Sequence, residues 1–419
     1  MSELRDRASI ERRQLKRLNA ALERMMPSNE FYRRKFGSDA RVDSLEAYRQ
    51  LPFTQKTELS NDQIERPPYG TNLTYAPDAY IRIHKTSGTT GRPLRWLDTE
   101  ESWNWWGECW AEVYRAAGVT RHDRVFFAFS FGPFIGFWSA YEGARRIGAL
   151  ALPGGAMSSE QRIDAILSNE ATTLVSTPTY ALRLAEVAEA AGMDIASSAV
   201  RATIHAGEPG ASIPAAKQAI ETAWGAKCFD HAGATEVGAW GYTCEAEEGM
   251  HLNEEEFIFE IIDPETGEQA DEGELVVSNL GRVGMPIIRY RTGDHVRWLK
   301  GNCPCGRPSR RLDGGVVGRV DDALLIRGVV VFPSSIEAVV RRFPQVAEYS
   351  VEVSRPSALD VVTMRVELKE GDGETLKKIG AAFRSALGLS VAVERAESGT
   401  LPRFEMKARR VTDKRADTT

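Results

Sequence analysis

A short loop rich in hydroxyl residues and glycine is the first part of the chain whose composition suits a chemical task. It consists of Ser87, Gly88, Thr89, Thr90 and Gly91. Glycine lets the backbone approach an anion closely enough to point N–H groups at it, and the hydroxyls add further donors. Such a loop suits the β- and γ-phosphates of a nucleotide. Taken alone it also fits an ordinary turn, and it is not a Walker A loop, because no Gly-Lys-Ser/Thr follows.

Several polar stretches downstream accompany this loop. Residues 230–236 read Asp-His-Ala-Gly-Ala-Thr-Glu, residues 289–294 read Arg-Tyr-Arg-Thr-Gly-Asp, and residues 318–322 read Gly-Arg-Val-Asp-Asp. In order and spacing, these motifs resemble the adenylate-forming superfamily of acyl-CoA synthetases and adenylation domains. Two more stretches resemble its phenylacetate-CoA ligase branch: Ala-Gly-Glu-Pro at 206–209 and Pro-Arg-x-Glu-x-Lys-x-x-Arg-Val at 402–411.

The resemblance implies an enzyme that activates an aromatic carboxylic acid with ATP. The carboxylate attacks the α-phosphate, pyrophosphate leaves, and the acyl-adenylate passes its acyl group to the thiol of CoA. A carrier-protein thiol or an amine is the alternative acceptor. Such chemistry needs an adenine slot, a ribose anchor, a metal at the phosphates and a positive charge near the reacting oxygens. The expected cofactors are therefore ATP/AMP, Mg²⁺ and CoA.

The resemblance also assigns catalytic roles to three residues. Thr235 would offer its hydroxyl to the α-phosphate, and Glu236 would bind Mg²⁺, which takes hard oxygen ligands. Lys407 would be the adenylation lysine, whose ammonium neutralises charge on the reacting carboxylate and α-phosphate. Many relatives carry another lysine directly after the loop, where this chain has Leu94. The phenylacetate branch also lacks that lysine, so the departure supports the branch assignment.

The nucleotide-binding residues follow from the same match. The backbone of residues 207–209 would line one side of the adenine. His231 would either stack on the adenine or make a hydrogen bond in the acid pocket. Asp294 can accept both ribose hydroxyls, and Arg319 would contact ribose or phosphate. With the loop, the expected set is Gly207, Glu208, Pro209, Asp230, His231, Asp294 and Arg319.

Four thiol and imidazole side chains form a second candidate site. Cys303 and Cys305 flank Pro304 in a turn, and Cys244 and His251 lie upstream. The spacing is not that of a standard zinc finger, but three cysteines and one histidine are a normal structural zinc set. Three ordinary thiols are the alternative. Some members of the phenylacetate branch carry a zinc here, so we predict a structural zinc held by all four side chains.

The elements that must position these residues alternate between helix and strand from about residue 99 to 245. This pattern predicts an α/β fold with parallel sheets covered by helices. Ligands of such folds bind beyond the carboxyl ends of the strands, where residues 206–209 and 231–236 both fall. The interval 103–141 is unusually aromatic; helical spacing makes most of its rings core, and the 131–134 turn is a candidate wall for an aromatic acid.

The remaining segments complete a two-domain prediction. Residues 246–317 read as short strands of a β-subdomain, and a mixed α+β unit follows, beginning with one strand over 323–331. By resemblance, a large domain covers residues 1–318, and a small mobile domain covers 319–419 with Asp321 as its pivot. A helix predicted over residues 3–27 is either a cap on the large domain or part of a homodimer contact.

Composition excludes several other classes of protein. The 419 residues are 42% hydrophobic, enough for a large core, and the net charge of −6 leaves no basic footprint for nucleic acid. No apolar run reaches the ~18 residues of a membrane span, and no apolar segment near the start forms a signal peptide. Five cysteines, an odd number, argue against a disulfide framework. We therefore expect a cytoplasmic protein without a membrane partner.

Overall fold

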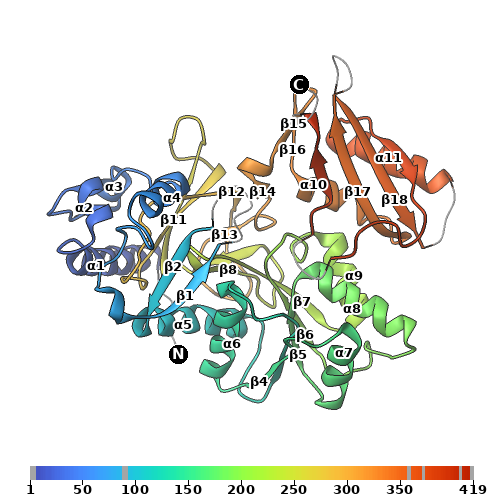
Figure 1. The fold of residues 1–419 in the computed structure, drawn as a ribbon, viewed down its shortest axis with the longest axis horizontal. Coiled ribbons are helices and arrows are strands. Elements are labelled where there is room, and N and C mark those ends of the chain that lie inside the picture. Colours follow the sequence, from blue (N-terminus) through green and yellow to red (C-terminus); the bar gives the residue numbers. More distant parts are fainter. Residues whose placement is uncertain (1–5, 87–92, 356–359, 370–372, 405–407, 416–419) are drawn as a thin grey trace.

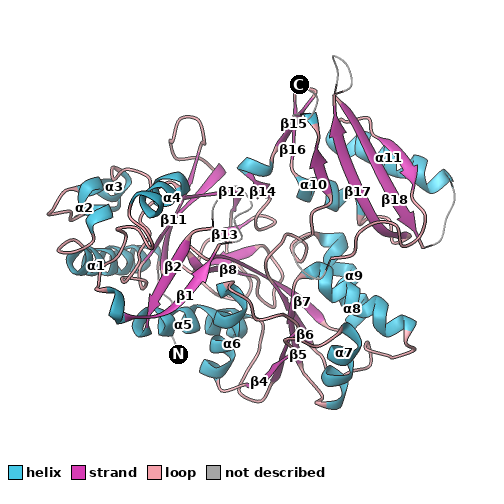
Figure 2. Cartoon of the chain, in the orientation of Figure 1, coloured by secondary structure: helices cyan, strands magenta, loops and turns pink. Residues whose placement is uncertain are grey.

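The computed structural model of the chain describes residues 6–86, 93–355, 360–369, 373–404 and 408–415. Figure 1 shows a large body built around one twisted sheet and, beside it, a smaller unit formed by the C-terminal part of the chain. Figure 2 shows that helices and strands are mixed in both parts. Every helix among the described residues is too short or too polar to cross a membrane.

Five parallel strands form the centre of the large body, in the order β4–β3–β5–β6–β7. The strands are β3 (Arg124–Phe127), β4 (Leu150–Pro153), β5 (Thr173–Ser176), β6 (Ala202–His205) and β7 (Lys227–Ala234). The helices between them are α6 (Ile135–Ile147), α7 (Ser159–Ser168), α8 (Pro178–Ala190) and α9 (Pro214–Trp224). All residues of β5 and β6 are buried, as expected where helices cover both faces. The predicted helix–strand alternation is confirmed.

Beyond β7 the same sheet continues through antiparallel strands, in the order β7–β8–β9–β13–β12–β11–β10. The strands are β8 (Gly238–Tyr242), β9 (Met250–Leu252), β10 (Phe257–Ile262), β11 (Glu272–Asn279), β12 (Tyr290–Leu299) and β13 (Arg311–Leu312). A further short strand, β14 (Gly318–Arg319), also pairs with β12. The strands predicted over residues 246–317 therefore join the central sheet through β9 and β8. Because β7 has a parallel neighbour on one side and an antiparallel one on the other, the pairing changes there.

A two-stranded antiparallel ribbon carries the loop of small hydroxyl residues. It pairs β1 (Tyr80–Lys85) with β2 (Arg95–Thr99), and Lys85 lies opposite Arg95. Residues 87–91 of the loop lie outside the described part of the chain. Helix α5 (Glu100–Ala116) starts directly after β2, where the Thr99 side chain accepts a hydrogen bond from the Ser102 N–H.

The N-terminal helices pack against the antiparallel part of the sheet. They are α1 (Arg7–Met25), α2 (Glu30–Phe36), α3 (Leu45–Arg49) and α4 (Lys56–Glu65), followed by the 3₁₀ turn η1 (Pro77–Ala79). Leu18, Leu22 and Met25 of α1 are buried in the main core. Arg17 on its other side donates to Glu256 at 2.6 Å. The first helix is thus a cap on the large body.

The C-terminal unit has a core of its own. Its strands are β15 (Leu324–Ile326), β16 (Val329–Val331), β17 (Val346–Ser354), β18 (Val361–Leu368), β19 (Ala392–Arg395) and β20 (Val411–Asp413). Its helices are α10 (Pro333–Val340) and α11 (Gly373–Leu387), and the 3₁₀ turn η2 (Val320–Asp322) precedes β15. The strands β19–β18–β17–β20 form one sheet. Ile336, Met364 and Phe383 are buried in the core that α10 and α11 make with this sheet.

One element prediction in this unit was wrong. The single strand expected over residues 323–331 is a hairpin of β15 and β16 in which Ile326 pairs with Val329. Arg327 and Gly328 have φ angles of 51° and 80°. Two consecutive residues in the left-handed region reverse the chain in a two-residue turn, which the alternation of apolar residues on either side concealed.

Candidate active site

The polar residues predicted to bind the nucleotide gather at the carboxyl ends of β6 and β7. Residues 206–209 follow the last residue of β6, and residues 230–236 form the end of β7 and the turn after it. Parallel pairing places His205 opposite Asp230. Ligands of α/β sheets bind at such ends, especially where the strand pattern changes, and the nucleotide site at this position stays a prediction.

A buried ion pair holds the turn that carries Thr235 and Glu236. The side chains of Arg282 and Asp98 are both 0% exposed, with Nη2 and Oδ2 2.6 Å apart. Nη1 of Arg282 donates to the Thr235 carbonyl at 2.6 Å, and its guanidinium lies 5.2 Å from the centre of the Trp96 ring. A buried charge persists only when it is paired and hydrogen-bonded. Arg282 therefore fixes the backbone from which Thr235 and Glu236 project, a role that no motif in the sequence indicates.

The Glu236 carboxylate faces a cation from the N-terminal helices. It is 6% exposed, and its Oε1 lies 3.5 Å from the Lys56 ammonium at the start of α4. The Tyr290 hydroxyl donates to the same oxygen at 3.5 Å. A carboxylate beside the Thr235 hydroxyl is a hard oxygen set that fits Mg²⁺ held jointly with substrate phosphates. Lys56 was not predicted, because it lies far from every motif in the sequence.

Asp230 and the loop after β6 face each other on one side of β7. Asp230 accepts a hydrogen bond from the Ser212 hydroxyl through Oδ2 and one from the His231 N–H at 3.0 Å through Oδ1. Burial raises the pKa of Asp230 to about 7. Near neutral pH the group can therefore donate or accept a hydrogen bond, which suits contact with a purine edge.

Glu208 connects this loop with the C-terminal unit. Its Oε1 accepts the Thr179 N–H of α8 at 2.9 Å, and its Oε2 accepts the Ala408 N–H at 2.9 Å. We predicted that the backbone of residues 207–209 lines the adenine; the structure adds a side-chain contact to the residue next to Lys407. Lys407 itself, like Ser87, Gly88, Thr89, Thr90 and Gly91, lies outside the described residues.

The ribose candidates Asp294 and Arg319 are brought together by strand pairing. They lie opposite each other on β12 and β14, and Arg319 Nη1 is 3.3 Å from Asp294 Oδ1. Arg319 also donates to the Thr292 carbonyl at 3.2 Å. His295, the residue after Asp294, stacks on Phe332 of the C-terminal unit, with ring centroids 5.2 Å apart. The predicted ribose anchor thus lies at the junction between the large body and the C-terminal unit.

His231 projects from the face of β7 opposite to Asp230. It packs against Trp110 of α5, with ring centroids 4.2 Å apart, and its Nδ1 lies 2.8 Å from the Gly241 carbonyl oxygen. Burial lowers the pKa of His231 to about 4, so the imidazole is neutral at pH 7. The structure places this ring beside α5, which favours the second of the two roles predicted for it.

The aromatic interval divides into core and partly exposed rings. The tryptophans of α5 are buried, which confirms the predicted core: Trp103, Trp105, Trp106 and Trp110. Phe131, Phe137 and Tyr141, before and within α6, are only half-buried. Phe137 stacks on Phe129 with centroids 3.4 Å apart, and Phe131 packs edge-on against Tyr141 at 6.0 Å. This second group offers flat apolar surface next to β3 and α6.

The four predicted zinc ligands converge. The ligand atoms of Cys244, His251, Cys303 and Cys305 all lie within 4.8 Å of one another. The sulfurs of Cys244 and Cys303 are 3.6 Å apart, and Cys305 Sγ is 3.4 Å from His251 Nε2. A tetrahedral zinc with bonds of about 2.3 Å to sulfur and about 2.0 Å to nitrogen places its ligands roughly 3.5–3.8 Å apart. The donor set and its spacing therefore fit zinc.

A hydrogen bond orients the histidine of the zinc candidate. His251 Nδ1 lies 2.9 Å from the Ser309 hydroxyl, which orients the ring so that Nε2 faces the sulfurs. The two remaining cysteines, Cys109 and Cys228, are buried in the two hydrophobic cores of the large body. A four-ligand set without a vacant protein position is typical of a structural site.

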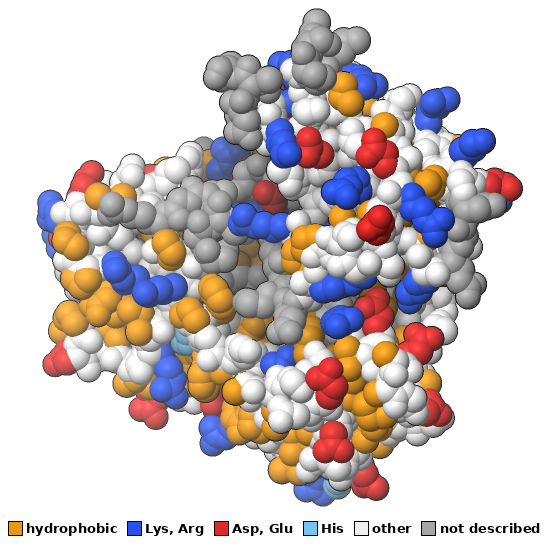
Figure 3. Space-filling model, turned by 45° about the vertical axis from the view of Figure 1, so that its right-hand side comes forward, with side chains coloured by type: hydrophobic (Ala, Val, Ile, Leu, Met, Phe, Trp, Pro, Cys, Tyr) orange, Lys and Arg blue, Asp and Glu red, His pale blue; other side chains and the backbone are white. Residues whose placement is uncertain are grey.

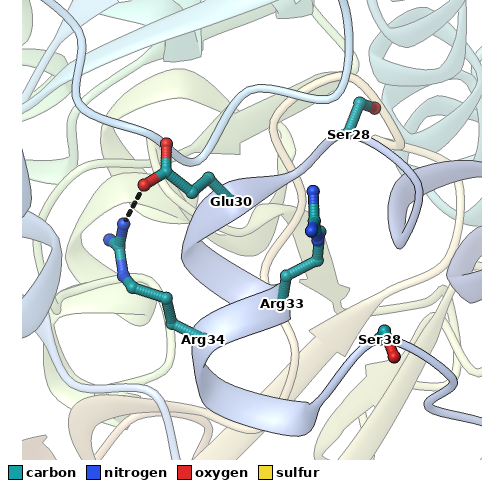
Figure 4. Close-up of a pocket in the computed structure, with 5 residues that line it drawn as sticks. All are labelled: Ser28, Glu30, Arg33, Arg34 and Ser38. Carbon is teal, nitrogen blue, oxygen red and sulfur yellow. Dashed lines mark hydrogen bonds and ion pairs between the residues drawn. The ribbon is translucent and has the colours of Figure 1, made fainter.

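A surface pocket of about 490 Å³ lies away from these strand ends, around α2 (Figure 4). It is lined by Ser28, Glu30, Arg33, Arg34 and Ser38. Arg34 donates to Glu30 at 2.8 Å and to Asp62 at 2.9 Å, so its charge is already compensated. The lining has no apolar wall for an organic acid, and we do not assign this pocket to the reaction.

Comparison with known proteins identifies the family. A family described as AMP-binding enzyme C-terminal domain matches residues 328–415. Phenylacetate-coenzyme A ligase of Pseudomonas putida is 33% identical over 426 residues, covering 97% of this chain and 94% of its own length. The chain belongs to the phenylacetate-CoA ligase family. It is an AMP-forming acid–CoA ligase of the adenylate-forming superfamily.

Solved structures of one relative relate this ligase to a stage of the reaction. A 2-hydroxyisobutyryl-CoA ligase in the postadenylation state, in complex with R3-HIB-AMP, is 29% identical and superposes with a TM-score of 0.93, covering 99% of this chain and 92% of that one. The same relative in complex with 2-HIB-AMP and CoA in the thioesterification state superposes with a TM-score of only 0.74. It is 30% identical, covering 99% of this chain and 91% of that one. The arrangement of the two units in our chain is thus that of the postadenylation structure.

Proposed function

We propose that this ligase activates an aromatic carboxylic acid, forming its acyl-adenylate and then its CoA thioester. Membership of the family indicates that the reaction is adenylation followed by transfer to CoA. The comparisons give no support to a carrier-protein thiol or an amine as acceptor. The observation that carries the aromatic substrate is the half-buried group Phe131, Phe137 and Tyr141. Flat apolar walls of this kind bind aryl groups by burying apolar surface and by edge-to-face contacts between rings.

The described residues take distinct parts in this proposal. Thr235 contacts the α-phosphate, and Glu236 would hold Mg²⁺, which would supply positive charge to offset that of the phosphates. Asp294 anchors the ribose with Arg319, and Asp230 lies at the adenine beside residues 207–209. Lys56 adds a positive charge beside Glu236, where the phosphates of a magnesium–nucleotide complex would lie.

The division into residues 1–318 and 319–419 is part of the same proposal. The two TM-scores of one relative show that its units take different arrangements in its two states. In our chain η2 (Val320–Asp322) lies between β14 and β15, so a pivot at Asp321 would rotate the C-terminal unit. Lys and Arg side chains are spread over this unit and its junction with the large body, which suits the phosphates of CoA (Figure 3). A homodimer remains a prediction.

The test of substrate and acceptor is pyrophosphate release with a panel of acids, followed by loss of free CoA thiol. We expect kcat/KM for aryl acids such as phenylacetate and benzoate derivatives to exceed that for aliphatic acids of equal size by roughly tenfold or more. A few additional apolar contacts in a pocket produce a difference of this size. A Glu236→Gln variant should lose pyrophosphate release. Equal rates with aliphatic acids would contradict the aromatic substrate.

The Glu208 contact yields a separate prediction about the two half-reactions. Glu208→Gln leaves one oxygen for two N–H donors, so the hydrogen bond to Ala408 or to Thr179 is lost. Hydrogen bonds to a charged group contribute about 1.5–3 kcal/mol, so we expect adenylation to slow roughly tenfold. Thioester formation from a supplied acyl-adenylate should change less, because that step uses the other arrangement.

The measurement compares pyrophosphate release with thioester formation in the same preparation. Glu189→Gln, an exposed carboxylate on α8, is the matched control and should leave both rates unchanged. If Glu208→Gln slows both half-reactions to the same degree, Glu208 does not act through the position of the C-terminal unit.

A further inference from the structure

Two arginines lie on either side of Lys407 in the sequence and have no role in the reaction described so far. Each is paired with a glutamate of the C-terminal sheet. Arg410 donates from Nε to Glu348 Oε1 at 2.6 Å and from Nη2 to Glu348 Oε2 at 3.1 Å. Arg403 donates from Nη2 to Glu367 Oε2 at 2.6 Å. Ion pairs therefore attach the chain to this sheet both before and after the lysine.

The two glutamates face each other across neighbouring strands. Glu348 of β17 lies opposite Glu367 of β18, and the two residues are 3% and 1% exposed. Like charges directly opposite in a sheet destabilise it, and a buried carboxylate requires a cation. In the described part of the chain, the cations that pair with these two carboxylates are Arg410 and Arg403. The facing carboxylates thus form an anchor for the segment that carries both arginines.

Further contacts hold the same segment against the sheet. The Arg410 guanidinium lies 5.4 Å from the centre of the Tyr349 ring and 5.5 Å from that of the Phe404 ring. The Leu401 N–H donates to Glu367 Oε1 at 2.5 Å. Directly after Arg410, strand β20 continues the chain beside β17. The position of the sheet therefore determines the position of the chain on both sides of the lysine.

Between these anchors, the segment contacts the large body. The Ala408 N–H donates to Glu208 Oε2 at 2.9 Å. Ala408 is the residue after Lys407 and lies two residues before Arg410. Loss of an anchor would therefore shift the chain at the point where the C-terminal unit meets the proposed site. A misplacement of about 1 Å in a reacting group can lower a rate by roughly 10²-fold.

We propose that Arg403 and Arg410 are positioning residues for adenylation. Through Glu367 and Glu348, they hold the segment of Lys407 so that its ammonium reaches the carboxylate and the α-phosphate. The proposal rests on the proposed function in taking Lys407 as the adenylation lysine. Transfer of the acyl group to CoA does not use this lysine, so that step does not need the anchor.

The test measures both half-reactions in Arg403→Gln and Arg410→Gln. We expect kcat for pyrophosphate release to fall roughly tenfold or more, while KM for ATP and acid stays within about threefold. The KM values change little because the proposed substrate contacts lie on the large body. Thioester formation from a supplied acyl-adenylate should stay within about twofold of wild type.

Two further variants distinguish positioning from a change of charge. Arg410→Lys keeps the charge but cannot bind both carboxylate oxygens in the same fork geometry, so it should recover part of the rate. Arg384→Gln removes an exposed arginine of α11 and should leave both half-reactions unchanged. A loss in Arg384→Gln as large as that in the anchor variants would overturn the proposal.

The Lys407→Ala background shows whether the arginines act through the lysine. Adding Arg410→Gln to Lys407→Ala should cause no further loss of pyrophosphate release, because residues that act as one unit are not additive. Losses that multiply, or an equal loss of both half-reactions in the single variants, would overturn the proposal. If Arg410→Gln does not fold, Arg403→Gln decides the outcome, since its arginine side chain is 31% exposed against 7% for Arg410.

The same variants separate this inference from the proposed function. If Lys407→Ala releases pyrophosphate at the wild-type rate, the proposed role of the lysine fails, and the inference fails with it. If Lys407→Ala is slow while Arg403→Gln and Arg410→Gln match wild type, the role of the lysine stands and the inference alone fails.

Discussion

Lys407→Ala is expected to lower the rate of pyrophosphate release by roughly 10²–10³-fold, the usual effect of removing one charge that stabilises an adenylation transition state. The rate of thioester formation from a supplied acyl-adenylate should stay within about twofold of wild type. The reason is that, in its proposed role, the ammonium neutralises the reacting carboxylate and α-phosphate only in the first half-reaction. The contact between Glu208 and Ala408 places the residue next to Lys407 against the site in the arrangement that matches the postadenylation structure.

The experiment measures the two half-reactions separately. Lys414→Ala is a matched control, because this lysine follows in the same segment and lies 2.7 Å from Glu352 on β17. It should leave both rates near wild type. An equal loss of both half-reactions in Lys407→Ala would remove the residue from its proposed role, and so would an unchanged rate of pyrophosphate release.

Loss of the zinc is expected to have the largest effect on stability. We predict about one zinc per chain, held by Cys244, His251, Cys303 and Cys305. Cys244 follows β8, His251 lies on β9, and the other two lie between β12 and β13, so the metal would join three parts of the antiparallel sheet. The binding of structural zinc contributes roughly 10–16 kcal/mol to the folding of zinc-finger peptides. For Cys303→Ser we therefore expect loss of the metal and a fall of about 10 °C or more in apparent Tm.

Metal analysis after exhaustive dialysis, with thermal unfolding of the same samples, tests this prediction. Cys228→Ser is the control, since this thiol is also buried but lies outside the cluster. It should keep the zinc. The folded fraction of the Cys303→Ser variant should still release pyrophosphate, because a metal with four protein ligands has no open position for catalysis. Wild-type protein without zinc, or a variant with undiminished zinc, would contradict the prediction.

The amino-acid sequence by itself determined much of this architecture. Alternating apolar patterns over residues 99–245 require helices on both faces of parallel strands, because only that packing buries such segments. The order of the motifs, with Thr235 and Glu236 at a strand end, indicated the family and the position of the site. The sequence also indicated the four candidate zinc ligands, since three cysteines and one histidine are a normal structural zinc set, and the zinc itself stays a prediction. These inferences depend only on the types of neighbouring residues and on the spacing of apolar residues along the chain.

Only the tertiary structure decided which residues far apart in the sequence support those motifs. Arg282 reaches Asp98 and the Thr235 carbonyl, Lys56 reaches Glu236, and Glu208 reaches Ala408. None of these pairs has a fixed spacing, because each depends on how helices and strands from separate parts of the chain pack. The proton position of His231 is likewise set by the Gly241 carbonyl of the neighbouring strand β8. Side-chain partners across a sheet follow from register and packing, which no local pattern encodes.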